Sequence, residues 1–271
     1  MNHPTSEIQA FKKKVVCHFQ KLGRTLPWRS TPTQYRVVVS EIMLQQTQVT
    51  RVLPKFEEFI HTFPNWKSLA ASDTSQLLRV WSGLGYNRRA LALRKIAKIV
   101  AQNGTLPRTM ETLRELPGIG PNTAGSILAF AFNQPVVFIE TNIRSVFIHH
   151  FFEDRTDIAD SELLPLIEAT LDQKHPREWY SALMDYGSWL KQQTPNPSRK
   201  SATHVTQTKF KGSLREARGA VVKHLLSRPN QTVAALAKAT HIDRARIVAA
   251  CEALKKEGTV IEIRKKFNLA P

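Results

Sequence analysis

The chain has 271 residues, of which 39 are Lys or Arg and 22 are Asp or Glu, so its formal charge is +17 and its pI is near 10.2. Such an excess of positive charge is typical of nucleic-acid binding, although an acidic protein partner or a membrane surface is the alternative. No apolar run approaches the ~18 residues of a membrane span, and residues 1–14 lack the apolar core of a signal peptide, so we expect a cytoplasmic protein.

Cysteine and histidine content limits the cofactors. The two cysteines, Cys17 and Cys251, lie far apart, each within a helical apolar pattern, and we expect both to be small core residues. Two thiols are too few for a disulfide framework, a cysteine-rich zinc site or an iron–sulfur cluster. His149 and His150 have no third ligand at metal spacing, so no metal or other cofactor is predicted.

Helical periodicity dominates residues 6–191, where apolar residues recur at three- and four-residue spacing. Glycines and prolines such as Pro64, Gly104 and Pro107 fall between these segments as helix stops. We therefore predict an all-α domain over residues 1–190.

The composition changes after Leu190. Residues 191–212 are rich in proline and basic residues and predict a basic linker. Residues 213–271 predict helices at 214–226, 232–239 and 243–257, then a strand or small hairpin at 259–267. This order outlines a winged helix, in which Arg244 and Lys265 are candidates for DNA-backbone contacts. A module that only packs against the first domain explains the same pattern, and the sequence leaves both open.

Several segments of the first domain carry chemistry-bearing residues. Trp28 and Arg29 either line a base pocket or begin the first long helix. Glu41 is one acid among apolar and amide residues, and burial would hold it protonated as a general acid requires, although a surface glutamate fits the local pattern as well. Tyr86 follows a glycine-bracketed loop and precedes Arg88 and Arg89, an arrangement suited to base stacking with phosphate contacts, or to anchoring two helices.

The segment LPGIGPNTAG at 116–125 places two glycines in a tight turn before a helix. Such a turn directs backbone N–H groups and a helix dipole at one point, which suits a phosphate. Glu140 then closes an apolar run at the start of the next helix. A carboxylate there is held ionised by the dipole and could stabilise a cationic sugar or activate water, or it could simply cap the helix.

Taken together, the segments LPWR at 26–29, SEIMLQQTQV at 40–49 and LPGIG at 116–120 resemble the helix-hairpin-helix DNA glycosylase superfamily. The nearest branch is the MutY-type adenine glycosylases. WSGLGY at 81–86 and LMDYG at 183–187 support the resemblance, which covers about residues 7–190.

The resemblance implies roles for individual residues. Glu41 would protonate the departing adenine, and Glu140, with Asn142 beside it, would stabilise the cationic sugar. Gln46 and Tyr86 would wedge into the base stack. The base pocket would be lined by Trp28, Arg29, Asn122 and Asp185. The hairpin would hold a phosphate, and in this family it admits a monovalent cation; its residues are Pro117, Gly118, Ile119, Gly120 and Thr123.

Four departures from the family are visible in the sequence. Glu140 replaces the family aspartate, and Asn122 stands where bifunctional relatives carry a lysine, so we expect base removal without strand cleavage. The four-cysteine iron–sulfur loop expected after Asp185 is missing. The winged-helix-like unit stands in place of the domain that recognises 8-oxoguanine in the relatives.

The expected function is therefore a monomeric, monofunctional DNA glycosylase of base excision repair that acts on duplex DNA at the nucleoid. It would remove a mispaired base, adenine opposite guanine or 8-oxoguanine. The alternatives are a thymine or uracil mismatch glycosylase of the same fold and a DNA-binding relative without activity.

Overall fold

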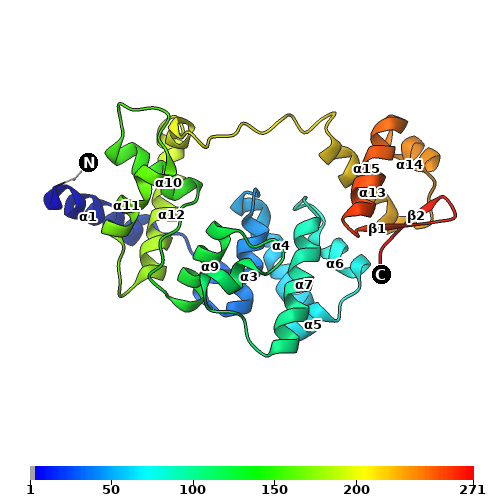
Figure 1. Cartoon of the computed structure of the whole chain (residues 1–271), viewed down its shortest axis with the longest axis horizontal. Helices are drawn as coiled ribbons and strands as arrows, with labels where there is room; N and C mark the ends of the chain where they lie inside the picture. Colours follow the sequence, from blue (N-terminus) through cyan, green and yellow to red (C-terminus); the bar gives the residue numbers. More distant parts are fainter. Residues whose placement is uncertain (1–3) are drawn as a thin grey trace. The chain divides into compact units, whose positions relative to one another are not determined.

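The computed structural model describes residues 4–271. Its helices and strands, in chain order, are α1 Thr5–Leu22, α2 Pro27–Ser30, α3 Gln34–Leu44, α4 Val49–Thr62, α5 Trp66–Ala70, α6 Thr74–Trp81, α7 Arg88–Asn103, α8 Met110–Arg114, α9 Pro121–Phe132, α10 Thr141–Phe151, α11 Asp160–Thr170, α12 Pro176–Gln193, the 3₁₀ helix η1 Pro197–Lys200, α13 Leu214–Ser227, α14 Val233–Thr240, α15 Arg244–Lys256, β1 Val260–Ile263 and β2 Lys266–Leu269 (Figure 1). The prediction of a helical array followed by three helices and a small hairpin is confirmed.

The chain forms two compact units that do not follow chain order. Unit 1 contains the described residues up to Glu41 together with residues 107–206, and unit 2 contains residues 42–106 together with 207–271. Each unit is therefore built from two separate stretches of chain.

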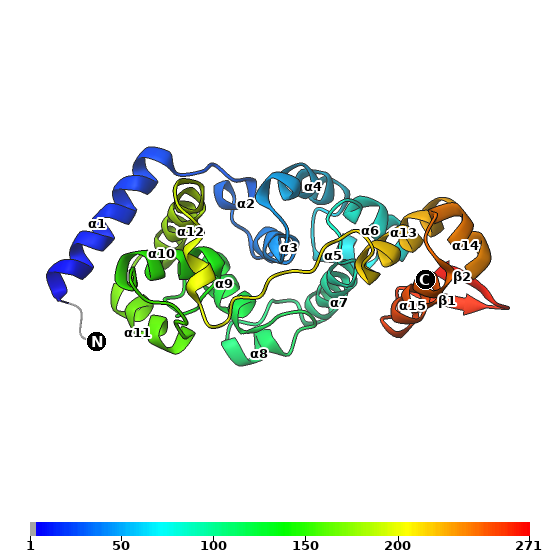
Figure 2. The ribbon, with the colours of Figure 1, turned by 90° about the horizontal axis from the view of Figure 1, so that it is seen from above.

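Unit 1 is centred on α10 and α12, which pack side by side, and α1 lies along α12 (Figure 2). The buried faces are apolar and aromatic, as with Phe147, Tyr180 and Leu183. At the crossing of the two helices, a Cβ atom on Gly187 would lie 2.5 Å from the carbonyl oxygen of Asn142. Only glycine allows this approach, which fixes the start of α10 against α12.

The α8–α9 hairpin and the extended run after it deliver Glu140 to that crossing. Gly118 has a φ of +80°, and Gly120 is the N-cap of α9, where Pro121 occupies the first helical position. A Cβ atom on Gly125 would lie 2.4 Å from Cβ of Phe138, so glycine lets the apolar run lie directly on α9.

Unit 2 joins α4–α7 to the C-terminal helices and hairpin. The strands β1 and β2 are antiparallel, with Val260 opposite Leu269 and Ile263 opposite Lys266. Helix α13 packs on α6, where Arg79 Nη2 donates to the carbonyl oxygen of Leu226 at 3.0 Å. The C-terminal helices thus contact α6 through α13.

Two regions differ from the sequence-based expectation in detail. Helix α12 continues to Gln193, and η1 follows with Pro197 and Ser198 buried, so only the residues after 201 are both extended and exposed in the segment expected as a linker. Cys251 is buried as expected, but Cys17 is exposed because it faces away from the side of α1 on which Phe11 and Val15 are buried.

Within residues 4–271, no helix is both long and apolar enough to cross a membrane.

Candidate active site

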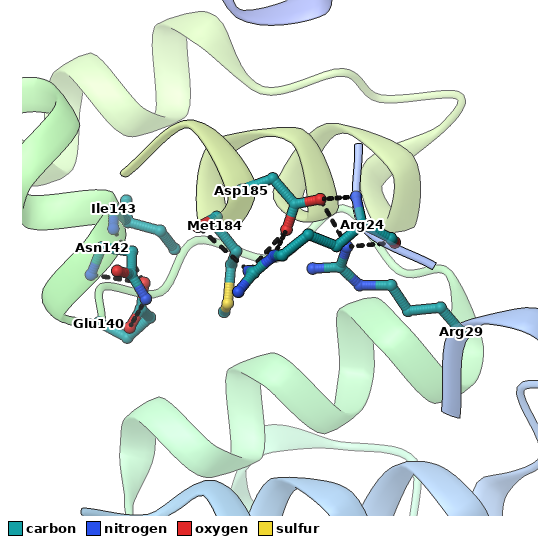
Figure 3. A network of polar contacts seen from close by, with 7 residues as sticks. All are labelled: Arg24, Arg29, Glu140, Asn142, Ile143, Met184 and Asp185. Carbon is teal, nitrogen blue, oxygen red and sulfur yellow. Dashed lines mark hydrogen bonds and ion pairs between the residues drawn. The ribbon is translucent and has the colours of Figure 1, made fainter. Parts of the chain in front are cut away.

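Asp185 on α12 is the centre of a buried ionic network (Figure 3). Its side chain is 1% exposed; Oδ1 accepts from Arg24 Nε at 2.7 Å, and Oδ2 accepts from Arg24 N at 2.7 Å and from Arg29 Nη1 at 2.9 Å. Burial opposes ionisation, yet hydrogen bonds and positive charge from Arg29 and Arg24 hold the pKa of Asp185 below its ordinary value. The network ties α2, with its buried Trp28, to α12.

Arg24 was missed at the level of sequence. It lies in the connection between α1 and α2, outside any motif, and a single arginine there gives no signal of its partner on α12. Arg29 and Asp185, two of the four residues expected to line a base pocket, form an ion pair with each other.

Glu140 is the N-cap of α10 and turns back onto its own helix (Figure 3). Oε1 accepts from the backbone N–H groups of Asn142 at 2.7 Å and Ile143 at 2.9 Å, and Oε2 accepts from Asn142 Nδ2 at 3.2 Å. The capping expected from the sequence is present. Burial raises the pKa of Glu140, however, while these hydrogen bonds and the charge of Lys191 oppose the rise. The expected ionisation by the helix dipole and nearby N–H groups therefore did not include burial, which acts in the opposite direction.

Glu41 lies in the last turns of α3, in a different electrostatic environment. Burial raises its pKa to about 7, the charge of Glu140 acts in the same direction, and the charge of Arg29 acts against it. Its carboxyl group also contacts the Ser126 hydroxyl. This hydrogen bond lowers the pKa of Glu41 and so opposes the effect of burial. Ser126 Oγ also lies 2.9 Å from the carbonyl oxygen of Thr123.

Unit 1 thus holds two carboxyl groups, and the charge of Glu140 helps to raise the pKa of Glu41. Glu140 is bonded by three donors that favour the charged form, whereas Glu41 has a pKa that leaves a large fraction protonated near pH 7. A protonated Glu41 together with an ionised Glu140 would suit the cleavage of a bond whose leaving group needs a proton while positive charge develops on the other side. Ser126 and Lys191, which act on this pair, were not identified in the sequence because they lie on other helices.

The hairpin residues lie on the surface of unit 1 except Ile119, which is buried and anchors the turn. Gly118, Gly120 and Asn122 are exposed, and Pro117 and Thr123 are half-buried. Gly120 is the N-cap of α9 and contributes no side-chain cap, and the start of this helix is exposed at Pro121 and Asn122. Asn122 is the second residue of that helix.

In unit 2, Gln46 and Tyr86 share an uncommon backbone conformation. Their φ angles are +56° and +49°, values that L-residues other than Asn and Asp rarely adopt. Gln46 is exposed and Tyr86 is half-buried. Strain of this kind persists where the surrounding contacts enforce it, and it clusters at functional sites.

Arg89 supplies those contacts. Nη1 donates to the carbonyl oxygens of Ile42, Met43 and Gln45 at 2.9, 2.8 and 2.5 Å. Nη2 donates to Thr47 Oγ1 at 3.0 Å and to the carbonyl oxygens of Leu84 and Gly85 at 3.1 Å each. The guanidinium also lies 5.4 Å from the ring centres of Trp81 and Tyr86.

Arg89 is only 7% exposed, and burial lowers its pKa to about 10. This buried position argues against the phosphate contact expected from the sequence. Its neighbour Arg88 is exposed, so a phosphate contact by Arg88 stays a prediction.

The two basic candidates of the C-terminal helices and hairpin are also exposed. Arg244 begins α15, and Lys265 lies in the two-residue turn between β1 and β2. Both turn residues, Arg264 and Lys265, have positive φ angles, +49° and +61°.

The residues do not fit the iron–sulfur cluster of the family that the sequence resembles. The cluster needs four cysteine ligands, whereas the chain has two cysteines, on α1 and α15, and the segment after Asp185 has none. Among residues 4–271, no group of three or more His, Cys, Asp or Glu side chains is arranged to hold a metal ion.

Comparison with known proteins agrees with this geometry. Residues 39–168 match the family model described as HhH-GPD superfamily base excision DNA repair protein. Proteins named adenine DNA glycosylase are similar to the chain: that of Buchnera aphidicola subsp. Baizongia pistaciae is 38% identical over 66% of the chain and 52% of the relative, and that of Mus musculus is 32% identical over 68% and 38%. The chain spans about half the length of the first relatives that it matches.

Solved structures show the same fold at low identity. A thermostable thymine-DNA glycosylase aligns with a TM-score of 0.59 and 21% identity over 68% of this chain and 87% of that one. Endonuclease III in a non-covalent DNA complex aligns with a TM-score of 0.57 and 15% identity over 68% and 85%.

Proposed function

We propose that this chain, whose residues 39–168 are a domain of the HhH-GPD superfamily of base excision DNA repair proteins, is a monofunctional DNA glycosylase that removes adenine from mismatched duplex DNA. The observation that carries the proposal is the pairing of Glu41, whose pKa is raised to about 7, with Glu140, which is held by three hydrogen-bond donors.

In the proposed reaction, Glu41 donates its proton to a ring nitrogen of the flipped adenine, so that the base leaves as a neutral molecule. Positive charge that develops on the sugar is stabilised by the carboxylate of Glu140, which also orients the water that completes hydrolysis. Asn142 keeps that carboxylate in place, since it donates both a backbone and a side-chain N–H group.

The same proposal identifies the residues that would bind DNA. The turn at 117–120 and the start of α9 would hold a phosphate, and Gln46 and Tyr86 would occupy the space that the flipped nucleotide leaves. Arg88, Arg244 and Lys265 are exposed cations suited to further phosphate contacts. The protein would act at the nucleoid as a monomer.

Adenine is favoured as the substrate because the relatives that align over two thirds of the chain are named adenine DNA glycosylase. A mispaired base is the cheapest to flip, so adenine opposite guanine or 8-oxoguanine is the expected target. Asn122 cannot form a Schiff base with the sugar, so the DNA strand should stay intact after base removal.

The proposal is tested with labelled duplexes that carry adenine, thymine, uracil or hypoxanthine opposite guanine or 8-oxoguanine. We expect alkali-labile sites only with adenine, and no strand break before alkali. Excision of thymine or uracil instead would identify the pyrimidine alternative. Binding without excision of any base would show that replacing the family aspartate by Glu140 has abolished activity.

A further inference from the structure

The extended segment that enters α13 is attached to Tyr86. Gln207 Nε2 donates to the hydroxyl of Tyr86 at 2.5 Å, and Arg215 Nη1 donates to the same oxygen at 3.1 Å. Arg215 lies in the first turn of α13, where the helix dipole disfavours a cation, so its position there depends on such contacts. Both donors bind the phenolic oxygen of Tyr86, so the segment that enters α13 is tied to this residue.

The segment between these two residues is held in one conformation by its own hydrogen bonds. Arg215 Nη2 donates to the carbonyl oxygen of Thr208 at 2.6 Å, and Ser213 Oγ donates to that of Phe210 at 2.6 Å. Gly212 has a φ of +83° that suits glycine, and its N–H group donates to Glu216 Oε2 at 2.7 Å. Residues 207–216 therefore form a fixed turn beside Tyr86.

This turn presents an aromatic ring to solvent between two cations. Phe210 is 61% exposed, and its neighbours Lys209 and Lys211 are exposed as well. A single exposed apolar side chain is ordinary on a protein surface. Here, however, the ring is held on a braced turn, flanked by lysines and tied to a residue proposed to enter DNA. An aromatic ring flanked by cations is the arrangement by which proteins stack on unpaired bases while holding the adjacent phosphates.

We propose that Phe210 stacks on the base left unpaired opposite the flipped nucleotide, and that Lys209 and Lys211 contact the phosphates beside it. The inference rests on the proposed function, because it takes Tyr86 to be inserted where the base pair opens. When one base of the pair leaves the stack, its former partner loses its hydrogen bonds and becomes accessible from the position of the wedge. Stacking tolerates different bases, so this contact would add affinity for an opened pair without reading its sequence.

The test separates binding from excision. Affinity is measured by fluorescence anisotropy with the full chain and a duplex containing 2′-fluoro-adenosine, whose electron-withdrawing substituent resists hydrolysis. One duplex places guanine opposite this nucleotide, and the other places an abasic spacer there, which offers no base for stacking. Phe210→Ala should weaken binding of the first duplex about 5-fold or more, and of the second less than about 2-fold. Phe210→Trp should keep the affinity of both.

Val205 supplies the matched control, since it lies in the same extended segment and is 84% exposed. Val205→Ala should leave both affinities unchanged. Replacing Lys209 and Lys211 by Gln should lower the salt dependence of binding for both duplexes alike, by about 0.9 in log–log slope for each phosphate that is no longer neutralised.

Equal losses with both duplexes, or no loss with either, would overturn the proposal. Because Phe210 is exposed, thermal unfolding of Phe210→Ala should match that of the unmodified protein, and a lower melting temperature would mean instead that the ring packs inside the protein. If the unmodified protein excises no adenine but the two duplexes still differ, the proposed activity fails while the base contact stands.

Discussion

Gln46 and Tyr86 lie far apart in the chain, yet the loops that carry them are bonded to the same buried guanidinium. Arg89 donates to Gln45 and Thr47 on either side of Gln46, and to Leu84 and Gly85 just before Tyr86. It also donates to the carbonyl oxygens of Ile42 and Met43 near the end of α3. A pair of strained loops is thereby fixed to the end of this helix.

Arg89→Lys should impair base flipping. An ammonium cannot span the acceptors that the planar guanidinium reaches in both loops, so the wedge should lose its fixed conformation. We expect single-turnover excision of paired adenine to fall about tenfold or more, whereas adenine in a bulge, which is already unpaired, should be excised at nearly the original rate. The exposed Arg228→Lys is the matched control and should affect neither substrate. Equal losses on paired and bulged adenine would show that Arg89 only maintains the fold.

Glu41→Gln should abolish excision, keep DNA binding and stabilise the protein at alkaline pH. Burial raises the pKa of Glu41 to about 7 from an ordinary value of 4.5, so between these pH values the folded state binds more protons than the unfolded state. Stability therefore falls as the pH rises through this window, and glutamine removes that loss.

Relative to the unmodified protein, the Glu41→Gln variant should gain up to about 3 kcal/mol at pH 8 and little at pH 4.5. Urea unfolding at the two pH values measures the difference, and the exposed Glu115→Gln serves as control. For the unmodified protein, kcat/KM should decline above about pH 7 as Glu41 loses its proton. A gain that is independent of pH would contradict the assigned ionisation.

Glu140→Asp should lower the rate of excision even though it restores the residue typical of the family. Asp is a good N-cap, so the melting temperature should change little. The aspartate side chain is shorter, so its carboxylate would lie about one bond length closer to the backbone. Misplacement by about 1 Å can cost 10²-fold in rate. We expect kcat to fall about tenfold or more in single-turnover assays. A faster variant would mean that glutamate is a defect in this chain.

Asp185→Asn should destabilise unit 1 by about 3 kcal/mol, because Arg24 and Arg29 would keep their charges without a partner. Removing a cation at the same time should recover part of the loss. A double-mutant cycle with Arg24→Met, followed by urea unfolding, measures this coupling. Additive losses would mean that the ion pair contributes nothing beyond its separate parts.

Replacing Arg264 and Lys265 by Asn and Gly should stabilise the hairpin while weakening DNA binding. Two positive φ angles in a two-residue turn suit Asn-Gly, whereas arginine and lysine are strained there. We therefore expect a higher melting temperature together with a salt slope smaller by about 0.9 for each phosphate that the turn neutralises in the unmodified protein. A more stable variant with unchanged binding would show that the turn does not contact DNA.

The sequence predicted features that depend on local pattern. Helical periodicity located the helices, and the one expected at 243–257 begins at Asp243, which caps α15 because its Oδ1 accepts from Arg246 N at 2.9 Å. The cap at Glu140 follows from its place between an apolar run and a helix start. These features need only residues a few positions apart.

Other features depend on residues that meet only in the folded chain. Nothing near Arg24 indicates Asp185, and nothing near Arg215 indicates Tyr86. Arg88 and Arg89 look equivalent in the sequence, but they differ in the fold, one exposed and one buried. The positive φ angles of Gln46 and Tyr86 are likewise imposed by tertiary contacts, because neither residue type favours them.

Each unit is built from two separate stretches of chain, so the order of synthesis limits when unit 2 can fold. Residues 42–106 leave the ribosome early, but their partners in unit 2, residues 207–271, emerge last. Until then α6 lacks the helix that covers it, and Thr74 lacks the carbonyl oxygen of Pro271 that its hydroxyl binds at 2.8 Å. Unit 2 therefore cannot complete its fold until residues 207–271 have been made, and a chain cut after residue 206 would contain half of unit 2 without its partner.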